Sequence, residues 1–221
     1  MKATLKGFSD ELDSTEVNIP DSLIPTTKNN NTNQDDLIAF VQDPKIIEKA
    51  VEGSMEKRQA VIDKANENRD MKPYIHHSNL IENIDDPKED TQSLKAWEWL
   101  IKQDAIVPSV ILALHYKITK NQLKKGEAGE YRKVQVWVGN YTPPPAMIVS
   151  QLVYDWCMDV NYTELEKLPR EAHVAFEKIH PFIDGNGRTG RMLMWLQEKK
   201  LGQIPTMIRF EDRQRYYEWF K

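Results

Sequence analysis

The chain has 221 residues, 40% of them apolar and 29% charged, which suits one soluble globular domain with an extension. Its formal net charge of −4 disfavours a protein whose main task is to bind nucleic acid. It contains no apolar run long enough to span a bilayer, and the N-terminus lacks the apolar core of a secretory signal. We therefore expect a cytoplasmic protein that acts neither on nucleic acid nor in a membrane, in keeping with its single cysteine, Cys157.

The N-terminal third differs in composition from the rest of the chain. Residues 1–36 are polar and weakly periodic, which predicts a flexible N-terminal tail. From Asp43 to Asp70 apolar residues recur at roughly helical intervals, so we expect a helical extension over residues 37–69. The main domain is then expected to span residues 70–221.

A short helix is expected at the start of that domain, over about residues 76–86. Ser78 is a suitable N-cap, a short apolar face follows it, and Pro87 should stop the helix. Glu82 lies on this helix. By itself, a glutamate that follows an N-capping serine is ordinary surface structure.

The only convincing strand pattern lies in EYRKVQVWVGNYTPPP. Every second residue from 134 to 138 is a valine, and Gly139–Asn140 is a turn pair, so we predict a short β-hairpin over about residues 130–142. The free edge of such a hairpin could be covered, or it could accept an extended peptide as an added strand.

The other periodic segments predict helices. They are residues 93–104, 107–126, 146–161 and 168–179, with the start of a last helix in 210–221. The predicted fold class is therefore all-α with one hairpin. His115, in the apolar part of 107–126, is expected to be a core histidine whose ring is hydrogen-bonded, and His173 gives no stronger signal.

The stretch HPFIDGNGRTGR, from His180 to Arg191, stands between two apolar, helix-like segments. It combines an imidazole, a carboxylate, a carboxamide, two glycines and two guanidinium groups. Taken singly, each has an ordinary explanation: a structural histidine at a helix end, a polar turn, and arginines on a helix surface. Taken together between buried-looking helices, they favour a site that handles a phosphate chain.

Each residue type in this stretch suits part of that task. Gly185 and Gly187 let the backbone turn and approach a ligand closely, and a helix that starts near Arg188 would point its free N–H groups at an anion. Arg188 and Arg191 lie on one face of that helix and can grip phosphate oxygens, while Asn186 adds neutral donors.

Two side chains in the stretch suit catalysis at a phosphate. Asp184 is its only carboxylate, and Mg²⁺ commonly uses one or two protein carboxylates and takes its other ligands from phosphates and water. His180 would be largely neutral near pH 7 and could take a proton from an attacking hydroxyl. No serine or cysteine is placed to form a covalent intermediate, which favours direct in-line displacement.

HPFIDGNGRTGR matches the motif HxFx(D/E)GNGRxxR at every specified position, and on these residues the chain resembles the Fic family. The family's helical bundle with a flap hairpin corresponds to about residues 70–221. The resemblance implies an enzyme that uses ATP and Mg²⁺ to transfer AMP to a serine, threonine or tyrosine hydroxyl of a protein, with pyrophosphate as the leaving group.

The resemblance also implies a role for each matching residue. The implied roles are His180 as the base, Asp184 as the Mg²⁺ ligand, Gly185, Asn186, Gly187 and Arg188 on the phosphates, Arg191 on the γ-phosphate, Tyr217 in the nucleotide pocket, and Gln135, Val136 and Trp137 as the flap residues that pair with the target segment.

The sequence SNLIEN, from Ser78 to Asn83, resembles the family's inhibitory pattern (S/T)xxxE(G/N). The resemblance implies that the Glu82 carboxylate pairs with Arg191 and so occupies the guanidinium that the γ-phosphate needs. Replacement of Glu82 should then release activity. In some relatives the same glutamate helps water to remove AMP from the modified target.

Several alternatives stay open at this point. The same fold can transfer phosphate, UMP or phosphocholine, or remove AMP. A non-catalytic nucleotide-binding module is a further alternative, although a base aimed at the phosphates, as His180 and Asp184 suggest, has no use in a pure binder. The expected partner is a protein with a hydroxyl side chain, which could be the chain itself, and a homodimer is left open.

Overall fold

The computed structural model describes residues 69–221, the strands β1 (Lys2–Thr4) and β2 (Glu16–Asn18), and the single residues 53, 57, 60 and 64. The chain divides into two compact units, Met1–Glu67 and Asn68–Lys221. In the first unit β1 pairs with β2 in antiparallel register, with Lys2 opposite Asn18, a strand pair that the sequence did not predict. Residues 53, 57, 60 and 64 are helical. The rest of the predicted tail and extension lies outside the described residues.

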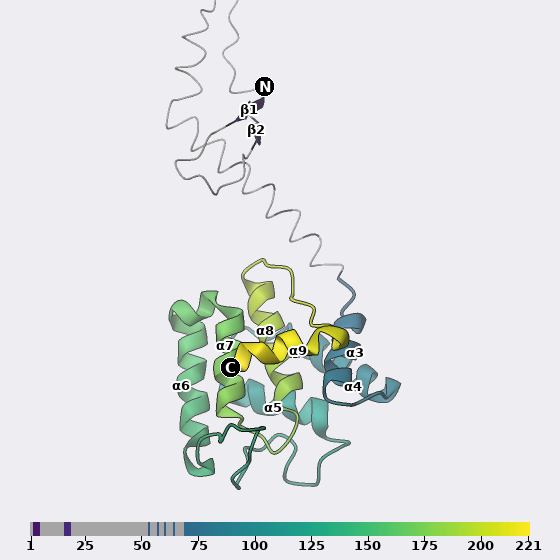
Figure 1. Ribbon diagram of the computed structural model, residues 1–221, viewed down its shortest axis with the longest axis vertical. Helices are drawn as coiled ribbons and strands as arrows, with labels where there is room; N and C mark the ends of the chain where they lie inside the picture. Colours follow the sequence, from purple (N-terminus) through teal and green to yellow (C-terminus); the bar gives the residue numbers. More distant parts are fainter. Residues whose placement is uncertain are drawn as a thin grey trace, which may run out of the picture. The chain divides into compact units, whose positions relative to one another are not determined.

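The second unit is built from helices, and α8 (Asn186–Lys200) runs through its middle (Figure 1). It contacts α3 (Lys72–Ile81), α5 (Pro108–Thr119) and α7 (Pro169–Ile179). The other helices are α4 (Pro87–Leu100), α6 (Val149–Tyr162) and α9 (Arg213–Tyr217), with 3-10 turns η2 (Ala146–Ile148), η3 (Glu164–Lys167), η4 (Phe210–Asp212) and η5 (Glu218–Phe220). The all-α expectation is confirmed for this unit.

The sequence of α8 explains its central place. Every residue from Met192 to Leu196 is buried, so the helix is apolar all round rather than along one stripe, as expected of a helix covered by neighbours on all sides. Trp195 packs edge-on against Tyr74 and Trp97, with ring centroids 5.8 and 6.2 Å apart. None of the helices in the described part of the chain is long and apolar enough to cross a membrane.

Two predictions about the region of α3 were wrong. Ser78 is not an N-cap: α3 begins six residues earlier, at Lys72, and Ser78 is buried inside it. Pro87 does not stop this helix either, because α3 has already ended at Ile81. Instead Pro87 starts α4, where a missing N–H costs nothing, and the Asp86 carboxylate caps that helix by accepting from the Lys88 amide at 2.8 Å.

The predicted hairpin is reduced to one bridge, between Val138 and Tyr141, around the expected turn at Gly139–Asn140. The two-stranded ladder does not continue, for two physical reasons. The returning arm contains three consecutive prolines, which have no N–H to donate. The buried Arg132 guanidinium also takes up carbonyl groups on both arms, those of Val134 and Pro144. We call residues 130–142 the flap segment.

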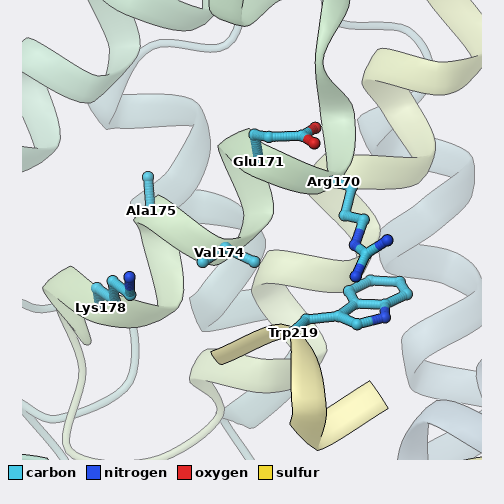
Figure 2. Close-up of a pocket in the computed structure, with 6 residues that line it drawn as sticks. All are labelled: Arg170, Glu171, Val174, Ala175, Lys178 and Trp219. Atoms are coloured by element: carbon cyan, nitrogen blue, oxygen red, sulfur yellow. The ribbon is translucent and has the colours of Figure 1, made fainter. Parts of the chain in front are cut away.

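The C-terminal turn is packed onto α7. A surface pocket between them is lined by Arg170, Glu171, Val174, Ala175, Lys178 and Trp219 (Figure 2). The Arg170 guanidinium lies over the Trp219 ring, 4.4 Å from its centroid, which is a cation–π contact. Trp219 in turn packs edge-on against Tyr216, whose ring is buried. This packing fixes Tyr216 against α7 and α8.

Candidate active site

The loop between α7 and α8 is held in a conformation that a free chain would avoid. His180 ends α7 with φ 49° and ψ 62°, in the left-handed region, and Gly185 precedes α8 with φ 80°. A left-handed non-glycine residue costs on the order of 1 kcal/mol or more, so its surroundings must hold it. Arg132 does so, because its Nε donates to the His180 carbonyl at 2.8 Å and its backbone N–H donates to the Pro181 carbonyl.

The Asn186 side chain closes this loop. Its Oδ1 accepts from the Phe182 amide at 2.8 Å, and its Nδ2 donates to the Phe182 carbonyl at 3.0 Å. The carboxamide therefore acts first as a clasp across the turn. Binding of a phosphate by the Asn186 side chain stays a prediction.

The His115 side chain, on α5, supports the same loop through a hydrogen bond. Its Nδ1 accepts from the Gly129 amide at 2.9 Å, so the proton must be on Nε2, which donates to the Asp184 carbonyl at 2.9 Å. Burial lowers the pKa of His115 to about 4, with the Asp184 carbonyl acting in the opposite direction, so the ring is neutral. The prediction of a buried, hydrogen-bonded His115 is confirmed. Gly185 must be small here, because a Cβ would come within 2.7 Å of Thr119 Cγ2.

His180 and Asp184 differ in exposure. Asp184 is exposed, and its Oδ1 accepts from the Gly185 amide at 2.6 Å. His180 is half-buried, and its Nδ1 is buried without a hydrogen-bond partner in the described structure. Burial lowers the pKa of His180, while the Glu177 carbonyl and the carboxylates of Glu82 and Asp184 act to raise it. A largely neutral imidazole is the form that can accept a proton.

Arg188, in the first turn of α8, is buried but incompletely paired. Its Nη2 donates to Gln122 Oε1 at 2.7 Å, and Gln122 Nε2 in turn donates to Glu89 Oε2 at 2.6 Å. Its Nε and Nη1 are buried and have no hydrogen-bond partner among the described residues. Burial lowers the pKa of Arg188, and Asp184 and Glu82 oppose that effect. A buried guanidinium with two unused nitrogens at a helix N-terminus is a place for an anion.

Arg191, one turn further along α8, is completely paired. Its Nε donates to Ser78 Oγ at 2.8 Å, its Nη2 donates to the Ser78 carbonyl at 2.9 Å and to Glu82 Oε1 at 2.7 Å, and its Nη1 donates to Tyr216 Oη at 3.1 Å. Burial alone would lower the pKa of Arg191, but Tyr216 and Glu82 outweigh it and raise that pKa.

The Glu82 carboxylate lies directly over the first turn of α8. A Cβ built on Gly187 would overlap Glu82 Oε1, so only glycine leaves room for the carboxylate there. The chain turns away at Asn83, whose φ of 59° is left-handed and is tolerated by asparagine. The structure thus brings Arg191 together with Ser78 and Glu82, which lie 113 and 109 residues earlier in the sequence.

Other residues that the sequence predicted for the site are more exposed or make contacts elsewhere. Tyr217 is 41% exposed, and it is its neighbour Tyr216 that reaches Arg191. In the flap segment Gln135 donates to the carbonyls of Val136 and Pro143, and Trp137 is 70% exposed. No sequence pattern indicated Tyr216, and the only signal for Arg132 is its place just before the alternating valines of the flap segment.

Within the described part of the chain, no group of three His, Cys, Asp or Glu side chains could hold a metal ion by itself. The donors present nevertheless fit Mg²⁺. Asp184 offers a hard, exposed carboxylate beside the helix N-terminus, and the remaining ligands would come from phosphates and water.

Comparison with known proteins shows similarity to one family. Residues 105–197 match the profile of the Fic/DOC family. The chain is 36% identical over 123 residues to the protein adenylyltransferase Fic of Nematostella vectensis, covering 53% of this chain and 29% of that protein. It is 35% identical over 133 residues to that of Drosophila willistoni, covering 55% and 25%. The chain thus spans less than a third of these curated relatives.

The fold agrees with this match. A Fic family protein from Desulfovibrio desulfuricans superposes with a TM-score of 0.58 at 24% identity, covering 80% of this chain and 65% of that one. The motif, the profile match over residues 105–197 and the curated relatives all show similarity to the Fic/DOC family, and the helical fold agrees with them.

Proposed function

We propose that the chain is a protein adenylyltransferase whose activity is restrained by its own Glu82. The observation that carries the proposal is the state of the two arginines on α8: Arg188 keeps buried donors free, while Arg191 is held by a carboxylate that stands over the helix N-terminus. The curated relatives, which bear the name protein adenylyltransferase, support the same reaction.

The phosphate chain of ATP would lie at the N-terminus of α8. There the free backbone amides of the first turn and the positive end of the helix dipole attract an anion. The unused Nε and Nη1 of Arg188 would donate to phosphate oxygens. Arg191 would bind the γ-phosphate once Glu82 has moved aside.

His180 would act as the base. The neutral imidazole takes the proton from a serine, threonine or tyrosine hydroxyl of the target protein as that oxygen attacks the α-phosphorus of ATP. The new oxygen–phosphorus bond forms while the bond to the bridging oxygen of pyrophosphate breaks. The products are AMP esterified to the target and pyrophosphate, with the proton left on His180.

Asp184 would hold Mg²⁺ together with phosphate oxygens and water. When bound, the ion would offset negative charge on the phosphates and so favour departure of pyrophosphate. The clasp between Asn186 and Phe182 and the His115 contact keep the Asp184 backbone fixed beside that position.

The flap segment would receive the target polypeptide. Most of its backbone is not used in a ladder, and Trp137 is exposed, so an extended target segment could pair alongside Gln135, Val136 and Trp137. The Arg132 guanidinium links this segment to the carbonyl of His180. A target hydroxyl docked on the segment would therefore lie at a set position relative to the His180 imidazole.

Replacement of Glu82 by Gly tests the proposal. Self-labelling by α-labelled ATP and Mg²⁺ should rise at least about tenfold, because a charge-assisted hydrogen bond no longer holds Arg191. Intact-mass analysis with several nucleotides identifies the group transferred: an AMP increment supports the proposal, whereas UMP, phosphate or phosphocholine, or removal of AMP from a labelled protein, would replace it. His180→Ala in the same background should abolish transfer while ATP binding persists; retained transfer would remove His180 from the role of base.

A further inference from the structure

A second set of buried polar side chains lies near Arg191 and comes from α7 and α9. Tyr216 comes from α9, and His173 and Glu177 come from α7. The first two are almost completely buried, and the Glu177 side chain is 13% exposed. Burying three polar groups in a core is costly unless each is paired, so their arrangement calls for an explanation.

The directions of the hydrogen bonds follow from simple chemistry. Arg191 has only donors, so Tyr216 Oη accepts from Nη1 at 3.1 Å. The Tyr216 hydroxyl proton is then directed to His173 Nε2, 2.9 Å away, and that nitrogen must be the acceptor. Burial lowers the pKa of His173 to about 3, with Arg191 acting in the same direction, so the ring is neutral. Its single proton therefore lies on Nδ1.

His173 Nδ1 faces Glu177. The nitrogen is 4.0 Å from Glu177 Oε1, and both atoms are buried without a hydrogen-bond partner among the described residues. Both lie against Gly190, where any Cβ would overlap Glu177 Oε1 and come within 2.8 Å of His173 Nδ1. At 4.0 Å the two atoms are neighbours but do not form a hydrogen bond. The hydrogen bonds of this series therefore run from Arg191 through Tyr216 to His173, and Glu177 lies next to their end.

We propose that Tyr216 and His173 form a hydrogen-bond relay, bordered by Glu177, that holds the Arg191 guanidinium in place for a nucleotide triphosphate when Glu82 has left. This inference rests on the proposed function, and it makes the three residues positioning residues. Arg191 otherwise depends on α3, which supplies both Ser78 contacts and Glu82 itself. A movement of α3 that releases Glu82 would also loosen Ser78, whereas Tyr216 remains fixed through the Trp219–Arg170 contact on α7 (Figure 2).

The charged and titratable groups that face Glu177 come from every helix around it. They are His173 on α7, Arg191 on α8, Tyr216 on α9 and Glu82 at the end of α3. Burial raises the pKa of Glu177 to about 8, while Arg191 acts to lower it. A carboxyl group kept in such surroundings is consistent with a role toward Arg191 rather than with simple packing.

The test uses the full chain with Glu82→Gly and compares ATP with AMP as ligands. Tyr216→Phe should weaken ATP binding about tenfold and leave AMP binding unchanged, because only ATP has the γ-phosphate that Arg191 is proposed to bind. Glu177→Gln, which keeps the shape and removes the titratable carboxyl group, should weaken ATP binding about threefold. Tyr162→Phe, at a tyrosine 74% exposed on α6, is the matched control. Equal losses for ATP and AMP, or no loss for either, would overturn the relay.

A second measurement does not depend on these variants. Nitrogen-15 NMR of the unsubstituted protein should show His173 neutral with its proton on Nδ1, and a proton on Nε2 would contradict the relay. Self-labelling measured on the same Glu82→Gly protein keeps the two proposals apart. If the Glu82→Gly protein labels itself and the relay variants bind ATP normally, only the relay is refuted. If the relay variants lose ATP binding selectively and the Glu82→Gly protein does not label itself, the relay is supported and the transferase proposal is refuted.

Discussion

Arg188 and Arg191 lie one turn apart on the same helix, are equally buried, and are in opposite states. Arg188 makes one side-chain contact, to the neutral Gln122, and keeps two nitrogens unpaired. Arg191 uses all of its nitrogens, and its partners come from α3 and α9. In the proposed phosphate site, one half therefore has donors left for a ligand, while the other half already holds an internal carboxylate.

The position of Glu82 fits the proposed inhibition, because it would allow the carboxylate to be released. Glu82 is at the end of α3, with its side chain 31% exposed, and a left-handed Asn83 follows it. A carboxylate at such an edge can leave without disrupting the core, whereas the Arg191 guanidinium is anchored from behind as well. In the proposed release, the Glu82 carboxylate would move and the Arg191 guanidinium would stay in place.

The largest effect on stability is expected when Arg191 is replaced by Met. The change strands Ser78, Glu82 and Tyr216 without their donor, and it should lower the free energy of unfolding by about 3 kcal/mol, less than for a fully buried pair because Glu82 is partly exposed. Urea unfolding measures this directly. A loss below about 1 kcal/mol would mean that the Arg191 contacts contribute little to the fold.

A smaller effect should appear in the pH dependence of stability. The pKa of Glu177 is raised by burial from 4.5 to about 8, so the folded protein keeps a proton that the unfolded chain releases. Its stabilising contribution is present below about pH 4.5 and is lost as the pH rises to about 8. Since the pKa values of His115 and His173 are lowered from 6.5, these residues act only below pH 6.5. Between pH 6.5 and 8 the free energy of unfolding should fall by up to about 1.4 kcal/mol per pH unit.

The matched control for that slope is Glu177→Gln, which cannot titrate. The decrease over pH 6.5–8 should be absent in this variant. Equal slopes in both proteins would show that Glu177 does not keep its proton on folding.

The smallest change in stability is expected for Arg188→Met. Removing a buried charge with one hydrogen bond should change the free energy of unfolding by no more than about 1 kcal/mol, and could increase it. In the Glu82→Gly background the same change should weaken ATP binding at least about tenfold, because the unused nitrogens are lost. A large loss of stability, or unchanged ATP binding, would show that Arg188 is a structural residue.

The sequence predicted those features whose residues lie close together along the chain. His180 to Arg191 are contiguous, so their residue types and one helix start were enough to predict a phosphate site. The pairing of Glu82 with Arg191 came from the resemblance to the Fic family, because nothing local connects residues so far apart.

What escaped prediction depends on tertiary contacts. Tyr216, His173 and Arg132 are scattered single residues, and each acquires its role only where three helices or two loops meet. The hairpin is limited to one bridge because the Arg132 guanidinium binds carbonyl groups of both arms and the prolines of the returning arm have no N–H to donate. Ser78 was misplaced because serine is common at helix starts, whereas here a buried arginine satisfies its hydroxyl inside a helix.

The measurement that tests the central claim most directly is the affinity of the unsubstituted protein and of Glu82→Gly for ATP and for AMP, by calorimetry with Mg²⁺. If the Glu82 carboxylate occupies the place of a phosphate on Arg191, the Gly variant should bind ATP at least about tenfold more tightly and AMP with unchanged affinity. Equal affinity of the two proteins for ATP would contradict the account.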